Sequence, residues 1–304
     1  MARLMRAFFY RISKDITFRI TLIVGAGMAV FMTLLYLILQ NAVGDGMKML
    51  SGQGMLISSF SPAQNFGIAI PINLISFTYL EFSQGSIRNK IIAGHSKAKI
   101  YASLFLSGLV FAFSLLIVYV GLCTALGSIF GGFDPNGMAV GGTTSLGMIV
   151  SPAYLWKFVI LAFLSYLTIV SFTVFIATVF RSMGPSIPVV MLVVMGAYLI
   201  PMILGAISSG LTMSAQAAYV AEFHQTPTME ELRSYDETVK TFIDISNVLK
   251  VVDPFYGIAA TETTMEGVAV IDNLTLFGGI ASSIVYSALF FLAGMNIFRK
   301  RDVK

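Results

Sequence analysis

Six apolar runs, each long enough to cross a lipid bilayer, constrain this chain more than any other feature. At 1.5 Å per residue, about 20 helical residues cross ~30 Å of hydrocarbon. Only 11% of the 304 residues are charged, against roughly 25% in a soluble domain. The sequence therefore predicts an all-α membrane protein with one transmembrane domain over residues 1–304. The expected spans are Arg19–Leu39, Pro62–Phe82, Ile100–Leu126, Pro152–Phe180, Ile187–Ile207 and Leu274–Phe298.

The positions of lysine and arginine predict the orientation of these spans. Of 19 such residues, five precede or open the first run, four lie between the second and third, one between the fourth and fifth, and four end the chain. Positive residues are retained on the cytoplasmic side, so these loops and both termini are expected there, in a plasma membrane. The pI near 9.1 then reflects topology, and no nucleic-acid partner is expected.

Three segments outside the spans carry helical signals. Residues 1–17 place apolar and basic side chains on opposite faces, which predicts a helix lying in the membrane interface. The long loop 208–273 is expected to form external helices. A capping box at Thr228–Glu231 and apolar residues at helical spacing predict one amphipathic helix over Met229–Leu249, and a second short segment is expected after Pro254. Between the second and third spans, residues 86–94 read as a short helix, with Ser86 as its cap and glycines on both sides.

The sequence lacks recognisable nucleotide-binding, catalytic and metal-binding motifs. It contains no nucleotide-binding P-loop, and its two histidines, His95 and His224, are expected on opposite sides of the membrane. The single cysteine, Cys123, reads as an apolar packing residue. No catalytic, cofactor-binding or metal-binding residue is therefore expected. No charged residue lies at mid-depth in a predicted span, which argues against an ion-driven carrier.

The stretch EFSQGSIRNKIIAGHSKAKIYASLFL, from Glu81 to Leu106, resembles a segment of ABC-2 type transporter permeases. The resemblance is to the branch that includes bacitracin- and lantibiotic-resistance and sodium-efflux permeases. That family has the pattern E-[FY]-x-x-G-[ST]-x-[RK]-N after its second span, matched here from Glu81 to Asn89. Its pattern S-[RK]-x-K-I-Y opens the third span, matched here from Ser96 to Tyr101.

The resemblance implies a type V exporter-like permease fold with six spans, an interfacial N-terminal helix and external helices between spans five and six. Residues 86–94 would be a coupling helix that docks on a separate ATPase subunit, which holds ATP and magnesium. Glu81 is expected to pair with Arg11 or Lys14, and Ile87 and Ile91 are expected to bind in a groove of the ATPase. The expected docking residues are Glu81, Gly85, Ser86, Ile87, Arg88, Asn89, Lys90 and Ile91.

The same resemblance implies a bacterial permease that forms a homodimer, or a heterodimer with a sister permease. It would export an amphipathic or peptide-like compound, such as an antimicrobial. Three other interpretations stay open: a membrane immunity or regulatory protein that transports nothing, a secondary carrier, and an intramembrane enzyme. A missing ATPase partner would favour the immunity or regulatory protein. Gradient-driven transport without ATP would favour the secondary carrier.

Overall fold

The structure is a computed structural model that describes residues 6, 9–10, 14–43, 51–60, 69–133, 138–139, 148–149, 155–225, 227–254, 262–263, 269–270 and 273–300. Its helices are α2 (Ile16–Val43), α3 (Gly52–Ser58), α5 (Ala69–Ser83), α6 (Ser86–Ile92), α7 (Lys97–Gly131), α8 (Leu155–Phe180), α9 (Met183–Phe223), α10 (Met229–Tyr235), α11 (Glu237–Val252) and α13 (Asn273–Lys300). Two antiparallel pairs of two-residue strands complete it, β1 (Met138–Ala139) with β2 (Met148–Ile149), and β3 (Glu262–Thr263) with β4 (Ala269–Val270).

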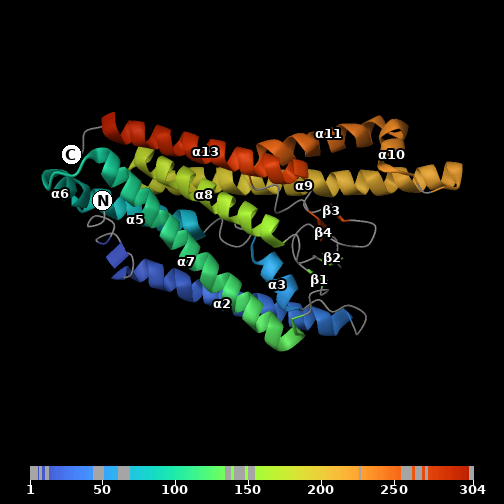
Figure 1. Ribbon diagram of the computed structural model, residues 1–304, viewed down its shortest axis with the longest axis horizontal. Helices are drawn as coiled ribbons and strands as arrows, with labels where there is room; N and C mark the ends of the chain where they lie inside the picture. The colour runs from blue at the N-terminus through green and yellow to red at the C-terminus, as the bar shows by residue number, and fades with distance from the viewer. Residues whose placement is uncertain are drawn as a thin grey trace.

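The long helices form an elongated bundle (Figure 1). Helix α8 packs along α13 and against α9, while α7 lies between α8 and α2. The ring of Phe113 on α7 stacks on that of Phe163 on α8, with centroids 4.4 Å apart. Where the backbones approach closely, small residues make the space: a Cβ on Gly108 would meet Leu74 and Val170 at about 3 Å. Such contacts are typical of helix packing in membranes.

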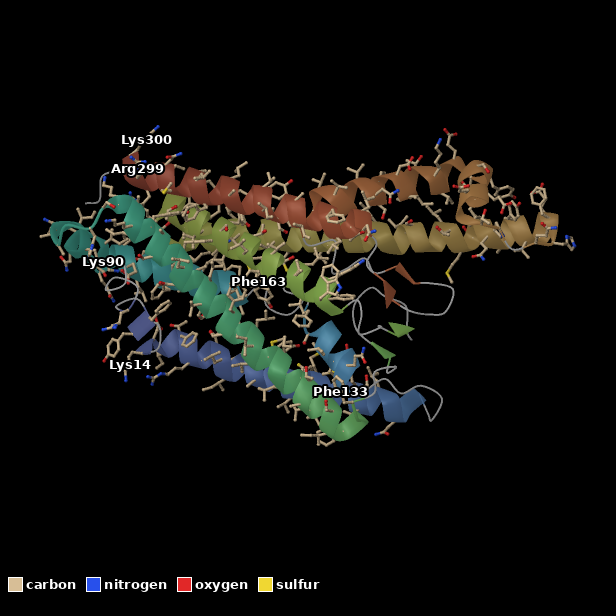
Figure 2. The ribbon with its side chains drawn as sticks, in the orientation of Figure 1. Lys14, Lys90, Phe133, Phe163, Arg299 and Lys300 are labelled. Carbon is tan, nitrogen blue, oxygen red and sulfur yellow. The ribbon has the colours of Figure 1, made fainter. Side chains whose placement is uncertain are left out.

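One end of the bundle collects positive charge, and we call it the basic end. Lys14, Lys90, Arg299 and Lys300 all lie there (Figure 2), together with α6, the start of α2 and the end of α13. Lysines and arginines from segments far apart in the sequence thus gather at one end. These segments are the ones whose lysines and arginines predicted a common side of the membrane.

Four helices are long and apolar enough to cross a membrane: Ile16–Leu39, Lys97–Gly131, Trp156–Phe180 and Asn273–Lys300. The chain is therefore a helical membrane protein. The second and fifth expected spans do not meet the same criterion within the described residues. Helix α5 has 15 residues in the described part of the chain, which does not include residues 61–68. In α9 the apolar stretch Met183–Ala197 is shorter than the length required of a membrane span.

Helix α9 corrects the predicted boundary between the fifth span and the outer loop. The sequence placed the end of this span near Ile207, but the helix continues without interruption to Phe223. Its 41 residues extend about 60 Å, twice the thickness of the hydrocarbon. Its far part supports α10 and α11, which fold back along it towards the start of α13 (Figure 1).

Local capping explains where α10 and α11 begin. The predicted capping box is confirmed: Glu231 N–H donates to the Thr228 hydroxyl, and the Thr228 N–H donates to the Glu231 carboxylate at 2.7 Å. The expected single helix is wrong, because Asp236 adopts an extended conformation and its carboxylate accepts from the N–H groups of Thr238 and Val239. Asp236 thus ends α10 and caps α11.

The capping box makes the stability of α10 depend on pH. Hydrogen bonds from the Thr228 backbone and hydroxyl lower the pKa of Glu231 from its ordinary value of 4.5. A lowered pKa means that the carboxylate stabilises α10 above the unfolded pKa, and that this contribution disappears as the pH falls through the folded pKa. We expect the hydrogen-exchange protection of α10 to decrease as the pH is lowered beyond 4.5. The Glu231→Ala variant should lack this pH dependence, and an equal dependence in it would contradict the assignment.

Some expected features lie outside the described residues. They include most of the interfacial helix 1–17, the expected starts of the second and fourth spans at Pro62 and Pro152, and the segment after Pro254. Two features not expected from the sequence are present. Helix α3 is buried against α7, where Gly52 N–H donates to the Gly132 carbonyl at 2.9 Å, and Lys157 is buried, with its ammonium 3.5 Å from the Asn273 amide oxygen.

Candidate docking helix at the basic end

Helix α6 is held between two sharp turns. Gly85, with φ of 65°, precedes it, and Gly94, with φ of 84°, follows it. Both conformations are left-handed, where a side chain would be strained, so glycine is required. The Gly94 and His95 N–H groups donate to the carbonyls of Ile91 and Lys90 at 2.9 and 3.1 Å. Ser96 then caps α7, accepting from the N–H of Lys99. The backbone of α6 is thereby fixed at both ends.

A buried carboxylate ties α6 to the end of α5. Glu81 is 0% exposed, and its Oε2 accepts from the Lys90 ammonium at 2.5 Å and from the Ser86 hydroxyl at 2.8 Å. A carboxylate out of water is costly unless charged and hydrogen-bonding groups surround it. Glu81 therefore favours the one orientation of α6 that brings Ser86 and Lys90 to it.

The two faces of α6 differ in character. Ile87 is 1% exposed and belongs to the main hydrophobic core, and Ile91 packs partly against the same core. Arg88 and Asn89 are exposed, and Ile92 is 74% exposed. Arg88 and Ile92 are four residues apart and lie on one face of the helix. We call Arg88, Asn89 and Ile92 the outer face of α6, a cationic and apolar surface at the basic end.

Aromatic contacts connect the end of α5, next to α6, to the rest of the bundle. The ring of Phe82, at the end of α5, meets that of Phe298 on α13 at 6.0 Å, and Phe298 meets Tyr101 on α7 at 5.9 Å. The Arg181 guanidinium, in the turn between α8 and α9, lies 5.4 Å from the Phe82 ring centre, a cation–π distance. The Lys97 ammonium donates to the Arg299 carbonyl at 3.2 Å. These contacts join the end of α5, next to α6, to α13 and to the turn between α8 and α9, and they join α13 to α7.

The residues expected to contact the ATPase subunit lie in different environments in the structure. Glu81, Ser86 and Lys90 bind one another within the chain, and Ile87 lies in the core, so the placement of Ile87 in a partner's groove is wrong. Gly85, not Ser86, is the residue that caps α6.

Lys90 binds Glu81 where Lys14 was expected, and the pairing of Glu81 with Arg11 stays a prediction. The Lys14 ammonium lies 5.9 Å from the Tyr10 ring centre instead, and Arg11 lies outside the described residues. Ile92 was missed, although its spacing of four residues from Arg88 was a usable signal. The outer face reduces the candidate contact residues to Arg88, Asn89 and Ile92, flanked by the half-buried Ile91.

No metal centre is visible in the described part of the chain, where no group of three or more His, Cys, Asp or Glu side chains is placed to hold an ion. Cys123 is buried, as expected. Comparison of the chain with protein-family models, curated proteins and solved structures finds no match in any of the three. The fold therefore defines a broad class of protein: a helical membrane protein, here with a rigidly held helix at its basic end.

Proposed function

We propose that this chain is the permease subunit of an ATP-binding cassette transporter of the ABC-2 type. The carrying observation is the fixation of α6 by the Glu81–Ser86–Lys90 cluster, which leaves Arg88, Asn89 and Ile92 exposed at the basic end. This outer face would dock on an ATPase subunit that binds ATP and magnesium. Glu81, Ser86 and Lys90 are positioning residues that hold the helix stiff.

The basic end fits the cytoplasmic side, because positive residues are retained there. In this proposal α5 and α9 supply the second and fifth of six spans, and the chain forms a homodimer or pairs with a sister permease in a bacterial plasma membrane. A short rigid helix transmits a movement of the ATPase subunit to the bundle, whereas a flexible loop would deform instead. Closure of the ATPase subunits would move α6 and, through Phe82 and Phe298, the ends of α5 and α13.

The proposed cargo is an amphipathic or peptide-like compound, such as an antimicrobial, moved outward. An amphipathic cargo is supported by the apolar character of the bundle interior, where the buried polar side chains among the described residues are mainly serine and threonine hydroxyls. The hydrolysis of ATP would occur on the partner, with no catalytic residue in this chain.

The Arg88→Glu variant tests the docking surface. Reversing a charge that faces a complementary partner costs several kcal/mol, so we expect at least a roughly tenfold loss of ATPase subunit co-purified with the chain in mild detergent. Arg299→Glu makes the same charge change at another exposed position of the basic end, and should retain the partner. ATP-driven transport should fall with Arg88→Glu and persist with Arg299→Glu.

Two outcomes would contradict this proposal. Equal retention of the ATPase in Arg88→Glu and in the wild type would exclude the outer face of α6 as the docking surface. Purification of the chain alone, under conditions that hold a known transporter together, would favour the immunity or regulatory protein instead.

A further inference from the structure

A cavity of about 320 Å³ lies between α8, α9, α13 and the end of α11. Its inner wall includes Ile169 and Val194, which are 0% and 2% exposed. Val193 and Ile200, on its rim, are 43% and 56% exposed. The cavity therefore opens sideways from the bundle, where lipid surrounds a membrane protein.

The cavity lies at mid-depth of the bundle. Thr168, on its wall, is halfway along α8, and Tyr286 is halfway along α13. Leu249 and Val252, at the end of α11, complete the wall. The middle of a bilayer is filled by hydrocarbon, so the opening faces the acyl chains of lipids and not their headgroups.

The polar groups of the wall are already engaged within the protein. The Thr168 hydroxyl donates to the Leu164 carbonyl at 3.0 Å and lies 3.1 Å from the Ser287 hydroxyl. Asp253, 8% exposed, has an interaction within the chain. The other described lining residues are aliphatic or aromatic, apart from Gly196. Water would find few hydrogen-bond partners in such a space, so an apolar ligand is favoured over a polar or charged one.

The volume indicates how much of an apolar ligand fits. A cavity of ~150 Å³ in another protein holds one benzene molecule. At the same packing, 320 Å³ holds roughly a dozen carbon atoms. This is most of one acyl chain and much less than two. A single acyl chain could enter between the rim residues while the headgroup of its lipid stays at the membrane surface.

We infer that the cavity binds one acyl chain of a membrane phospholipid, which enters from the side between α8, α9 and α13. Van der Waals contact with the apolar wall holds the acyl chain, because no hydrophobic driving force acts between hydrocarbon and hydrocarbon. The headgroup is not recognised, so its charge has no effect on binding. Leu249 and Val252 on the wall bring the end of α11 into contact with the lipid. The inference goes beyond the proposed function, and it requires neither an ATPase nor a second copy of the protein.

The test uses phosphatidylcholine and phosphatidylglycerol, each with a diazirine near the end of one acyl chain, in nanodiscs that hold the full protein. After illumination, mass spectrometry locates the labelled residues. We expect both lipids to label the buried wall residues Ile169 and Val194 equally. Labelling of Leu192, which is 75% exposed on the same helix as Val194, measures lipids that only surround the bundle.

The Gly196→Phe variant should exclude the acyl chain. Gly196 lines the cavity, and a Cβ there meets nothing within 4 Å, so the added ring has room to enter. The ring takes up the space of about half of the acyl chain, so we expect labelling of the wall to fall at least about tenfold. Labelling of Leu192 should not change. Gly121→Phe is the matched control, because Gly121 lies in a spanning helix, has equally open space and is not part of the cavity.

Three outcomes would overturn the inference. The first is labelling of Leu192 without labelling of Ile169 or Val194 in the wild type, a result that depends on no variant. The second is undiminished labelling of the wall in Gly196→Phe. The third is labelling of the wall by only one of the two lipids, which would mean that the headgroup is recognised. Arg88→Glu should leave labelling of the wall intact, which separates this result from failure of the proposed docking.

Discussion

Replacing Lys90 by methionine should lower the free energy of unfolding by about 3 kcal/mol, because breaking a buried ion pair leaves its partner poorly compensated. The partner is the carboxylate of Glu81, 0% exposed and 2.5 Å from the Lys90 ammonium. The charge of Glu81 would then be held in the core with the Ser86 hydroxyl and without this cation. Thermal or denaturant unfolding of the purified chain measures the loss.

A double variant separates the pair from general damage to the helix. Glu81→Gln with Lys90→Met removes both charges, and neutral replacements of buried pairs are often tolerated. It should therefore recover more than half of the stability lost in Lys90→Met. Lys97→Met is the control, because the Lys97 ammonium makes an exposed hydrogen bond to the Arg299 carbonyl, whose loss should cost less than about 1 kcal/mol. Equal losses for Lys90→Met and Lys97→Met would contradict the buried pair.

The same variants connect stability with the proposed function. If α6 transmits force to the bundle, the double variant should fold yet couple ATP hydrolysis to transport poorly, because the charged pair that helps to orient the helix is lost. A buried ion pair is weak evidence for stability, but it can specify one geometry. For α6, we propose that specifying this geometry is the role of the pair.

Local signals made parts of the fold predictable from the sequence. The glycines around α6 and the capping box at Thr228 act within a few residues, so their positions could be assigned directly. The gathering of basic residues at one end also followed from their placement between apolar runs. These features depend on neighbouring residues or on the membrane, and not on how distant helices pack.

Tertiary contacts explain what the sequence did not reveal. The burial of Ile87 and the exposure of Ile92 depend on which side of α6 faces the core. The pairing of Glu81 with Lys90 depends on the turn at Gly85, which folds α6 back on α5. Asp253 was missed as a deep carboxylate because it comes from an external segment, and only the packing of α11 against α9 and α13 brings it to the level of the spans.

The second large effect is expected where α7 and α13 meet at the basic end. A Cβ added to Gly294 on α13 would lie 2.1 Å from the Tyr101 hydroxyl oxygen on α7. Tyr101 is 0% exposed, and its ring contacts those of Phe291 and Phe298 at 5.5 and 5.9 Å, so it has little room to move. Overpacking of this kind costs about 1–3 kcal/mol, more than the helix propensity gained from alanine.

Gly294→Ala should therefore lower the free energy of unfolding, although glycine-to-alanine changes usually favour a helix. Gly121→Ala, with open space around its Cβ, should raise stability by up to about 1 kcal/mol. The Tyr101 hydroxyl has no hydrogen-bond partner among the described residues, so Tyr101→Phe should cost little and should restore part of the stability of Gly294→Ala. If Gly294→Ala and Gly121→Ala change the free energy of unfolding equally, α7 and α13 are not in close contact at Gly294. The ring contact between Phe298 and Tyr101 on α7 would then also be contradicted.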